Sequence, residues 1–574
     1  MKKLMLGNEA LAQGLYESGV RVVCSYPGTP STEITEFVSQ YDEIYSEWAP
    51  NEKVAAEAAF GASVAGARSF CAQKHVGLNV CADLFFTASY TGVNGGMVMA
   101  VADDPGMHSS QNEQDSRHYA IAAKLPMLEP ADSAECLAYT KMAYELSEQF
   151  DVPVLLRLTT RVAHSQSIVE PGVRAHDELK PYEKNAQKFV MIPAHAKARH
   201  LVVEERGQKL AAYAETTPLN SVEMHDAKIG VIAAGITYQY AKEALGDQAS
   251  YLKLGLINPL PVELIKDFAS KVDVLYVMEE LDPIIESHCQ QIGVKVIGKE
   301  AFTAVGEYTA AMIREKILGQ SRSVFHTDLT APGRPPVLCP GCPHRGTFYV
   351  LSKMKLTVSG DIGCYSLGAS APLSAMDTTV CMGASISALH GMNKARGPEF
   401  AKQSVAVIGD STFMHSGMTG LTDIVYNKGI STVLILDNSI TAMTGHQQNP
   451  TTGLTLKNEP TNAVDLTALC HALGVKRVRE VDPFDLSGLE AMLKEELAAE
   501  EPSVIIVKRP CALLKGVQHN PPLTVDADKC RSCQMCMKIG CPALSFSTGK
   551  AVVDTTLCVG CGLCQKLCPF GVIH

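Results

Sequence analysis

The hydrophobic residues in the first part of the chain form short apolar runs that alternate with longer segments of helical spacing. The runs 20–24, 96–101 and 152–158 consist largely of valine, leucine and methionine, and segments such as 134–149 lie between them. Short apolar strands that alternate with helices are typical of a parallel sheet covered by helices on both faces. We therefore expect an α/β domain over residues 1–170.

The same alternation occurs twice more, after two interruptions. Residues 171–225 are polar, rich in His, Lys and Glu, and are predicted to be a linker or excursion. A strand, a glycine turn and a helix at KIGVIAAGITYQYAKEAL then open a second α/β domain over 226–325. The proline-rich stretch TAPGRPPVLCPGCPHR leads into a third, over 330–515, with the strands SVAVIGD, STVLILDN and SVIIVKR. The fold class is therefore α/β with three parallel-sheet domains.

Residues 521–574 form a small fourth domain in which one cysteine pattern occurs twice. The first group reads C-x2-C-x2-C-x4-C-P and the second C-x2-C-x2-C-x3-C-P. This is the double signature of two [4Fe–4S] clusters, in which each triplet of thiolates takes its fourth ligand from the other group. On that rule one cluster is held by Cys530, Cys533, Cys536 and Cys568. The other is held by Cys558, Cys561, Cys564 and Cys541.

Two other interpretations of these cysteines are disfavoured. Zinc sites seldom use a CxxCxxC triplet, and disulfides suit small secreted domains. The four-residue spacing before Cys541, where the usual ferredoxin has three, leaves the fourth ligand of that cluster open. Between the two groups, LSFSTGKAVVD is expected to form a hairpin that turns at Gly549.

Composition and charge narrow the class of protein. A net charge of −11 argues against a nucleic-acid surface, which needs a basic face. The N-terminus MKKLMLGNEALAQG has an apolar stretch too short for a signal peptide, and no run approaches the roughly 18 apolar residues of a membrane span. Together with the iron–sulfur pattern, this predicts a cytoplasmic protein with neither a membrane nor a nucleic acid as partner.

Two short motifs in the third domain carry hard oxygen ligands. Asp410 lies in Gly-Asp-Ser and Asn438 in Asp-Asn-Ser, and each motif follows an apolar strand, so both are expected at the carboxyl edge of a parallel sheet, with a helix at about 418–427 between them. Carboxylate and amide oxygens suit Mg²⁺, with substrate phosphates supplying the remaining ligands. The alternative is an ordinary turn after each strand.

The pair of motifs resembles the GDG…N motif of thiamine diphosphate enzymes, with Ser411 in place of the second glycine. The resemblance implies that Mg²⁺ is held by Asp410, Asn438 and the carbonyl of Ile440. The residues expected to contact the cofactor in this domain are Gly409, Asp410, Ser411, Asn438, Ile440, Gly363 and Tyr365.

Two further resemblances lie in the first domain. Thiamine enzymes place a glutamate at a helix start reading E-x8-G, which Glu52 and Gly61 match, and its carboxyl favours the imino tautomer of the cofactor. Glu57 is the local competitor, and a solvated helix carboxylate is the alternative. The loop YPGTP resembles the YP-x-TP loop of 2-oxoacid:ferredoxin oxidoreductases, which implies that Thr29 contacts substrate. A turn-forming role is the alternative for Thr29.

A third set of cysteines surrounds the third domain. CPGC supplies Cys339 and Cys342, GDIGCY supplies Cys364, and Cys511 follows the last strand. The set resembles the proximal cluster of pyruvate and 2-oxoglutarate:ferredoxin oxidoreductases and implies a third [4Fe–4S] cluster. A redox-active CxxC or buried structural thiols are the alternatives. The cysteines predicted to be core residues are Cys24, Cys71, Cys81, Cys136, Cys289, Cys381 and Cys470.

The order of domains and motifs resembles the alpha subunits of indolepyruvate:ferredoxin oxidoreductases over essentially the whole chain. The motifs are YPGTPSTE, NEKVAAE, CPGCPHR, GDIGCY, GDSTFMHSG and DNSITAMTGHQ. The resemblance implies pyrimidine-type, transketolase C-like and diphosphate-type domains, followed by a two-cluster ferredoxin domain.

The same resemblance implies a CoA-dependent oxidative decarboxylation of aryl 2-oxoacids, with ferredoxin as electron acceptor. It also implies a separate, smaller beta subunit carrying a gamma-type domain, in a hetero-oligomer with this chain. Met443, where pyruvate enzymes keep a polar Asn, suits an apolar aryl substrate. The alternatives are another 2-oxoacid, a non-redox thiamine decarboxylase, and an electron-transfer subunit whose α/β domains are only a scaffold.

Overall fold

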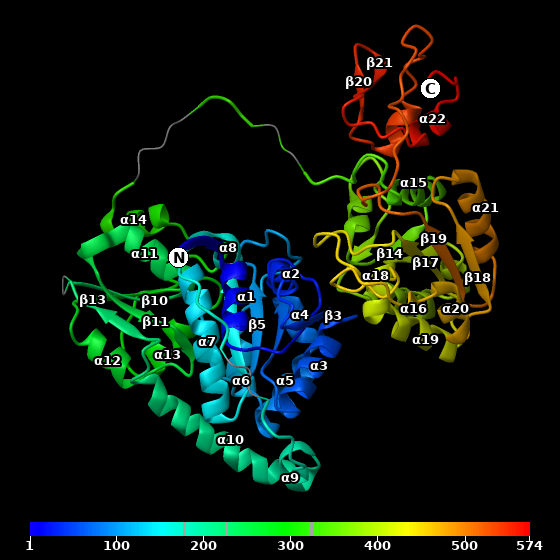
Figure 1. Cartoon of the computed structure of the whole chain (residues 1–574). Helices are drawn as coiled ribbons and strands as arrows, with labels where there is room; N and C mark the ends of the chain where they lie inside the picture. The colour runs from blue at the N-terminus through cyan, green and yellow to red at the C-terminus, as the bar shows by residue number, and fades with distance from the viewer. Residues whose placement is uncertain (176–178, 226–227, 322–326, 332, 334) are drawn as a thin grey trace. The chain divides into compact units, whose positions relative to one another are not determined.

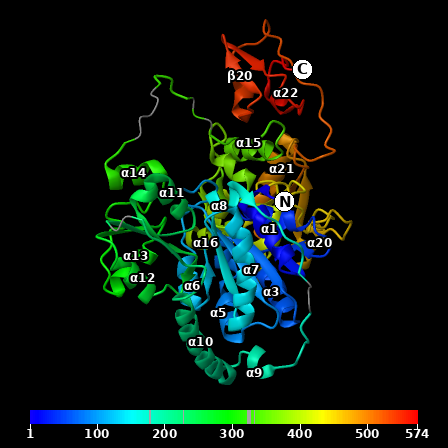
Figure 2. The same ribbon diagram turned by 60° about the vertical axis from the view of Figure 1, so that its left-hand side comes forward.

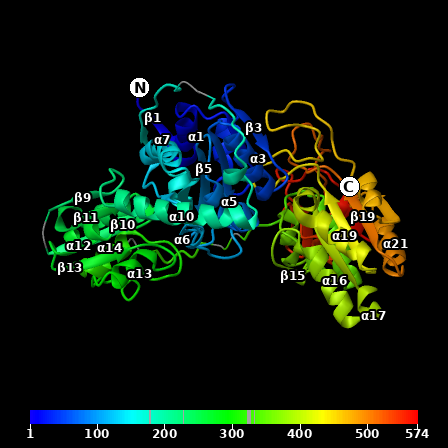
Figure 3. The same cartoon turned by 90° about the horizontal axis from the view of Figure 1, so that it is seen from below.

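The computed structural model describes residues 1–175, 179–225, 228–321, 327–331, 333 and 335–574. The chain divides into two compact units, Met1–Asp328 and Leu329–His574, hereafter the first and second units. Figures 1, 2 and 3 show their helices and strands from three directions. Among the described helices, none combines the length and apolar character that crossing a membrane requires.

The main sheet of the first unit has seven strands in the order β12-β6-β7-β5-β4-β2-β3. Its strands are β2 (Val22–Ser25), β3 (Tyr45–Trp48), β4 (Ser69–Lys74), β5 (Met97–Asp103), β6 (Met127–Leu128), β7 (Val154–Thr159) and β12 (Leu256–Asn258). All neighbours pair in parallel except β12, which is antiparallel to β6. The predicted parallel α/β sheet is confirmed.

Helices cover both faces of this sheet because successive strand residues point to opposite sides. Val98 and Ala100 of β5 pack into one core, and Met97 and Met99 into another. The helices of the first core are α1 (Gly7–Glu17), α2 (Thr32–Val38) and α7 (Ser133–Phe150). Those of the second are α3 (Glu52–Val64), α4 (His75–Val80), α5 (Ala82–Thr91) and α6 (Arg117–Ala123). A separate antiparallel pair joins β1 (Lys3–Leu6) to β8 (Gln166–Val169).

About half of the described part of the polar stretch 171–225 is helical rather than irregular. It contains α9 (Ala186–Phe189) and the 22-residue α10 (Pro193–Ala214), followed by the short strand β9 (Ser221–Glu223). Only a narrow stripe of α10 is buried, including Val203, Leu210 and Ala214. Because the rest of the helix is polar, its hydrophobic period is too weak to mark it in the sequence.

A second sheet in the first unit has the order β13-β10-β11-β9. Its other strands are β10 (Ile229–Ala234), β11 (Ser250–Leu254) and β13 (Val274–Met278), with helices α11 (Gly235–Leu245), α12 (Glu263–Ala269), α13 (Ile284–Gln291) and α14 (Ala310–Leu318). Strand β12 follows β11 in the chain but pairs with β6 of the seven-stranded sheet. The domain expected over 226–325 therefore contributes a strand to the sheet of the domain expected over 1–170. Their expected boundaries at 226 and 325 lie outside the described residues.

The second unit is built on a six-stranded parallel sheet in the order β15-β14-β16-β17-β19-β18. The strands are β14 (Thr357–Gly360), β15 (Thr378–Thr379), β16 (Ser404–Gly409), β17 (Thr432–Asp437), β18 (Arg477–Val481) and β19 (Ser503–Lys508). One face packs against α15 (His344–Met354) and α21 (Leu486–Leu497). The other packs against α16 (Ala384–Arg396), α19 (Met418–Tyr426) and α20 (Leu466–Ala472).

Two local features of this unit bear on the predictions. The helix expected at about 418–427 is α19, but helical backbone already begins at Asp410, through the turn α18 (Asp410–Thr412) and a π-helical turn over Phe413–Gly417. In the tail, β20 (Leu544–Ser547) and β21 (Lys550–Val553) form the expected hairpin, with Gly549 at a φ of 78°. The last helix is α22 (Leu563–Leu567).

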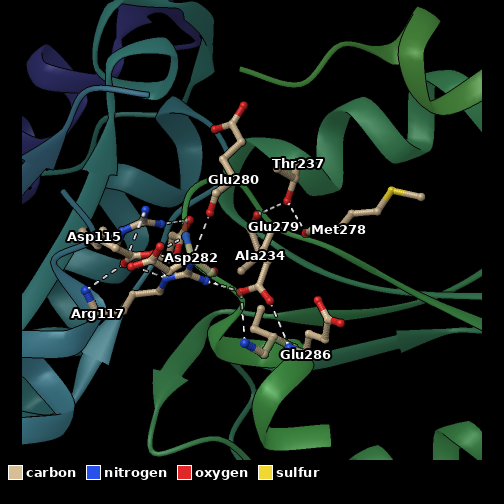
Figure 4. A network of polar contacts seen from close by, with 12 residues as sticks. Asp115, Arg117, Ala234, Thr237, Met278, Glu279, Glu280, Asp282 and Glu286 are labelled. Atoms are coloured by element: carbon tan, nitrogen blue, oxygen red, sulfur yellow. Dashed lines mark hydrogen bonds and ion pairs between the residues drawn. The ribbon is translucent and has the colours of Figure 1, made fainter. Parts of the chain in front are cut away.

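A buried network of charges joins the two sheets of the first unit (Figure 4). Arg117 at the start of α6 is 2% exposed and forms ion pairs with Asp115 at 2.6 Å and Glu279 at 2.5 Å. Glu279, directly after β13, also accepts the backbone N–H groups of Ile285 and Glu286 in the first turn of α13. Burial opposes ionisation of Asp115, but the Arg117 charge dominates and lowers its pKa. Removing Arg117 would take the closest cation from two buried carboxylates.

Glu280 is the member of this region with the opposite pKa shift. It accepts the Tyr308 N–H at 2.8 Å and is 5% exposed. Burial, followed by the charge of Glu307, raises the pKa of Glu280 from 4.5 to about 7. The folded chain therefore holds a proton on Glu280 between pH 4.5 and 7 that the unfolded chain has released.

We expect Glu280→Gln to flatten the pH dependence of stability. A raised acid pKa makes the free energy of unfolding fall as pH rises through this window, so the variant should match the parent near pH 4 and exceed it by about 1–3 kcal/mol at pH 8. Hydrogen exchange of peptides 274–308 measures the local stability at each pH. Glu263→Gln, on the exposed face of α12, is the control. An unchanged pH profile for Glu280→Gln would contradict the pKa assignment.

Candidate functional site

Four functional residues follow four neighbouring strands at one edge of the six-stranded sheet. Asp410 follows β16 directly, and Asn438 follows β17. Cys364 comes after β14 and Cys511 after β19, the strands on either side of this central pair. Because the carboxyl ends of parallel strands meet at one edge, residues far apart in sequence gather there.

Three oxygens converge between the two central strands. The side-chain oxygen of Asn438 lies 3.2 Å from Oδ1 of Asp410 and 2.7 Å from the carbonyl oxygen of Ile440. All three residues are buried. If the Asn438 amide were turned over, its nitrogen would donate to both other oxygens. In the arrangement described, three hydrogen-bond acceptors face one another without a donor between them. A hard divalent cation takes such oxygens as its ligands. The residues therefore fit Mg²⁺.

The other oxygen of Asp410 is held by a segment that the sequence did not mark. Asn449 Nδ2 and the Thr451 hydroxyl donate to Asp410 Oδ2 at 3.3 and 3.2 Å. Burial, followed by the charge of Asp437, raises the pKa of Asp410 to about 7. A cation beside Asp410 would offset both effects. The polar run QQNPTTG was the sole sequence signal for Asn449 and Thr451, and no spacing distinguishes them.

The other residues expected to contact the cofactor surround the Gly409 turn. A Cβ on Gly409 would lie 2.8 Å from Cε1 of Tyr365, and one on Gly363 would lie 2.3 Å from the same atom. The Tyr365 ring therefore occupies the space that two missing side chains leave. On the other side of the turn, the Thr441 hydroxyl donates to Ser411 Oγ at 2.9 Å. The glycines permit this close packing.

In the first unit, the structure separates the two candidate glutamates. Glu52 is the first residue of α3, after the N-cap Asn51, and is 5% exposed. Its side chain packs against Gly77, where a Cβ would lie 2.6 Å from Glu52 Oε1. Glu57 points into solvent and pairs with Lys53 on the same helix. Burial therefore favours Glu52, and the solvated role falls to Glu57.

Thr29 lies in the partly exposed YPGTP loop, next to a lysine that the sequence reading missed. The Ser109 hydroxyl donates to the Thr29 carbonyl at 3.4 Å, and Lys74 Nζ donates to the Ser109 carbonyl at 2.7 Å. Burial lowers the pKa of Lys74 to about 8, against the opposing charge of Asp104. Lys74 ends strand β4, and only its position at a carboxyl end could have suggested a role.

The tail cysteines divide around two cavities. Cys530, Cys533, Cys536 and Cys568 line one of them. Cys541, Cys558, Cys561 and Cys564 line the other. Each foursome takes three members from one sequence group and the fourth from the other, which is the exchange that the spacing predicts. Cys541 takes part despite its four-residue spacing.

These cysteines do not form single-metal sites. Within the described residues, no group of three or more His, Cys, Asp or Glu side chains is arranged to hold one ion. A single zinc ion draws its sulfur ligands to about 2.3 Å from the metal, whereas a four-iron cluster stands between its thiolates. A cavity walled by four thiols therefore fits a cluster better than an ion.

The third set of cysteines lies at the same sheet edge as the oxygen set. Cys364 interacts electrostatically with Cys339 and Cys511, and Cys342 with Cys339 and Cys364, so the four thiols are neighbours. Burial raises the pKa of Cys342 to about 12 and of Cys364 to about 11. The backbone N–H of Cys511 donates to the Asn438 carbonyl at 2.9 Å. This bond joins the cysteine set directly to the oxygen set.

The remaining cysteines are core residues with one exception. The buried ones are Cys24, Cys71, Cys81, Cys136, Cys289 and Cys470. Cys381 is exposed, and its assignment to the core is wrong. It precedes the turn into α16, where the flanking residues Val380 and Met382 are also accessible, and the lack of a motif spacing does not tell an exposed cysteine from a buried one.

Three family models match the chain. "Pyruvate flavodoxin/ferredoxin oxidoreductase, thiamine diP-bdg" matches residues 13–228. "Thiamine pyrophosphate enzyme, C-terminal TPP binding domain" matches 361–507, which contains the oxygen set. "4Fe-4S binding domain" matches 551–574, which contains the second cysteine group. The chain thus carries thiamine diphosphate-binding and iron–sulfur domains.

Curated relatives match over nearly the whole length. Indolepyruvate oxidoreductase subunit IorA of Archaeoglobus fulgidus is 38% identical, over 99% of this chain and 96% of its own. The IorA subunit of Methanothermobacter marburgensis is 39% identical over the same shares. Among solved structures, 2-oxoglutarate:ferredoxin oxidoreductase from Magnetococcus marinus is 18% identical with a TM-score of 0.48, covering 55% of this chain and 65% of that one.

Thiamine-binding domains, an iron–sulfur tail and this near-complete similarity agree with the residues gathered at the sheet edge. The chain belongs to the family of IorA subunits of indolepyruvate oxidoreductases.

Proposed function

We propose that this chain is the catalytic subunit of a 2-oxoacid:ferredoxin oxidoreductase that acts on aryl 2-oxoacids such as indolepyruvate. The observation that carries the proposal is the convergence of the Asp410, Asn438 and Ile440 oxygens beside four neighbouring thiols. A metal–diphosphate site next to an electron acceptor is what an oxidative decarboxylation requires. A decarboxylase without redox chemistry has no use for the thiols.

The chain's own residues take distinct parts in this reaction. Asp410, Asn438 and the Ile440 carbonyl would hold Mg²⁺, and the Gly409 turn would contact the diphosphate. Thiamine diphosphate, when bound, supplies the electron sink for loss of CO₂. Glu52 would hold a proton at its carboxyl group against the pyrimidine ring. Its burial excludes water from that proton.

We assign three [4Fe–4S] clusters to the three sets of thiols. The supporting observations are the two cavities, each lined by four tail cysteines, and the four neighbouring thiols at the sheet edge. The set at the sheet edge would receive electrons first, since the Cys511 backbone is hydrogen-bonded to Asn438 of the oxygen set. The tail sets would pass them to ferredoxin.

The substrate, co-substrate and partner follow from the family. The IorA relatives are named for indolepyruvate, and a half-exposed Met443 in the loop after β17 suits an apolar aryl group. CoA would accept the acyl group, and Thr29 would contact the 2-oxoacid. A smaller second subunit with a gamma-type domain would complete a hetero-oligomer, and the names of the relatives describe them as subunits.

Replacing the buried glutamate tests the thiamine role. We expect Glu52→Gln to lower 2-oxoacid-dependent ferredoxin reduction about 10²–10⁴-fold, because the amide cannot hold the proton. The assay uses the complex with its second subunit and follows aryl-acetyl-CoA and reduced ferredoxin. Glu57→Gln, on the exposed face of the same helix, should keep full turnover. Retained turnover in Glu52→Gln would leave the α/β domains as a scaffold, and arylacetaldehyde as product would indicate a non-redox decarboxylase.

Replacing the metal carboxylate tests the oxygen set. We expect Asp410→Asn to weaken Mg²⁺-dependent binding of thiamine diphosphate by about 10-fold or more, since the charged ligand is lost. Calorimetric titration of the cofactor with and without Mg²⁺ measures this. Asp423→Asn, an exposed carboxylate on α19, is the control. Equal affinity in Asp410→Asn and the parent would rule out metal ligation by Asp410.

Iron and sulfide analysis tests the third cluster. Anaerobically purified chain should contain about twelve irons, and about eight would mean two clusters. We expect Cys511→Ser to lose about four irons and Cys381→Ser, at an exposed cysteine outside all three sets, to lose none. About eight irons in the parent, unchanged in Cys511→Ser, would remove the cluster at the sheet edge.

A further inference from the structure

A buried arginine lies between two of the cysteine sets. Arg345 is in the first turn of α15, three residues after Cys342, and is 2% exposed. It ends the CPGCPHR motif, in which only the two cysteines are predicted to have a chemical role. Its guanidinium group contacts the ferredoxin-type tail.

The guanidinium group bonds two loops at once. On the side of the CPGC loop, Nε donates to the Cys339 carbonyl at 3.2 Å and Nη2 donates to the Leu338 carbonyl. On the side of the tail, Nη1 donates to the Ile539 carbonyl at 3.0 Å and to the Gly540 carbonyl. One side chain therefore links the backbone of the CPGC loop to the backbone of the tail segment before Cys541.

The tail carbonyls come from the segment that carries the unusual spacing. Ile539 and Gly540 directly precede Cys541, within the four residues that separate Cys536 and Cys541. Gly540 has a φ of 66°, which turns the chain before the ligand. The loop that contains the additional residue is therefore the loop whose carbonyls Arg345 binds.

The two loops are also in direct contact. Pro340, Gly341 and Arg345 line the same cavity as Cys541, Cys558, Cys561 and Cys564. Gly341 has a φ of 71°, and a Cβ there would lie 2.5 Å from Val559 Cγ2. The CPGC loop is therefore one wall of the cavity that the second tail set surrounds.

Arg345 lacks the usual partner of a buried cation. Within the described part of the chain it forms no ion pair with a carboxylate, and its acceptors are uncharged carbonyls. A buried charge without a counter-charge costs several kcal/mol. Burial lowers the pKa of Arg345, and the thiols of Cys541, Cys342 and Cys561 act against that shift. Negative charge on the two cysteine sets would therefore supply the counter-charge that the carbonyls lack.

We propose that Arg345 is a positioning residue that fixes the spacing of the Cys339 and Cys541 loops and raises the reduction potential of the cluster at Cys541. The proposal rests on the assignment of clusters to these cysteines. A fixed cation beside a cluster stabilises the state that has gained an electron, and net charge and hydrogen bonding are among the factors that set such potentials. The same contact keeps the two sets close enough for electrons to pass between them.

The electrostatic part is tested by EPR-monitored redox titration of the full chain with its clusters. Arg345→Gln should lower the equilibrium constant for one-electron reduction at least 10-fold, which is about 59 mV for one electron. Arg345→Lys keeps the charge and should shift it less. Arg479→Gln, at an exposed arginine of the same unit, is the control. An unchanged potential in Arg345→Gln with full iron content would overturn the proposal.

The positioning part is tested by hydrogen exchange on the full-length chain with its clusters. Arg345→Lys cannot reach all four carbonyls and should speed exchange in both 337–343 and 537–541. Faster exchange in one loop alone, or in neither, would overturn the proposal even if Arg345→Gln fails to keep its clusters. Neither measurement depends on turnover of a 2-oxoacid, so failure here is distinguishable from failure of the thiamine assignment.

Discussion

The site depends on one geometric constraint: parallel neighbouring strands end at the same edge. Strands β14, β16, β17 and β19 are consecutive neighbours in the sheet, and each delivers one functional residue beyond its last residue. Asp410 and Asn438 occupy the two central positions, with Cys364 and Cys511 on the flanks. Because backbone pairing fixes the strands, the sheet itself brings four residues spread over about 150 positions of sequence to one edge.

Arg117 and Arg345 are buried arginines with different kinds of partner. Arg117 is surrounded by carboxylates, so its ion pairs with Asp115 and Glu279 are complete within the protein. Arg345 is surrounded by carbonyls, which have a dipole but no charge. The first arrangement joins two sheets and serves the fold. The second leaves an unbalanced cation next to thiols, and such an imbalance is typical of functional sites.

Much of the site was predictable because its residues carry regular spacing. The spacing of the tail cysteines predicted that Cys541 and Cys568 each join the other group, as the lining of the two cavities shows, and the two strand-end motifs predicted that Asp410 and Asn438 lie at one edge. The α/β class followed from the apolar runs. Asn449, Lys74 and Arg345 were missed because their roles arise from contacts between segments distant in sequence, and a single polar residue carries no spacing signal. The same holds for β12, whose few residues cannot show which sheet they join.

Asn438 has a double attachment that links two parts of the site. Its side chain faces the oxygen set, and its carbonyl accepts the N–H of Cys511 at 2.9 Å. A displacement of the loop that carries Asn438 must therefore strain or break the hydrogen bond to the loop that carries Cys511. Whatever occupies the oxygen set is mechanically coupled to the ligand geometry of the neighbouring thiols. One residue therefore connects the oxygen set to the cysteine set through its side chain and its backbone carbonyl.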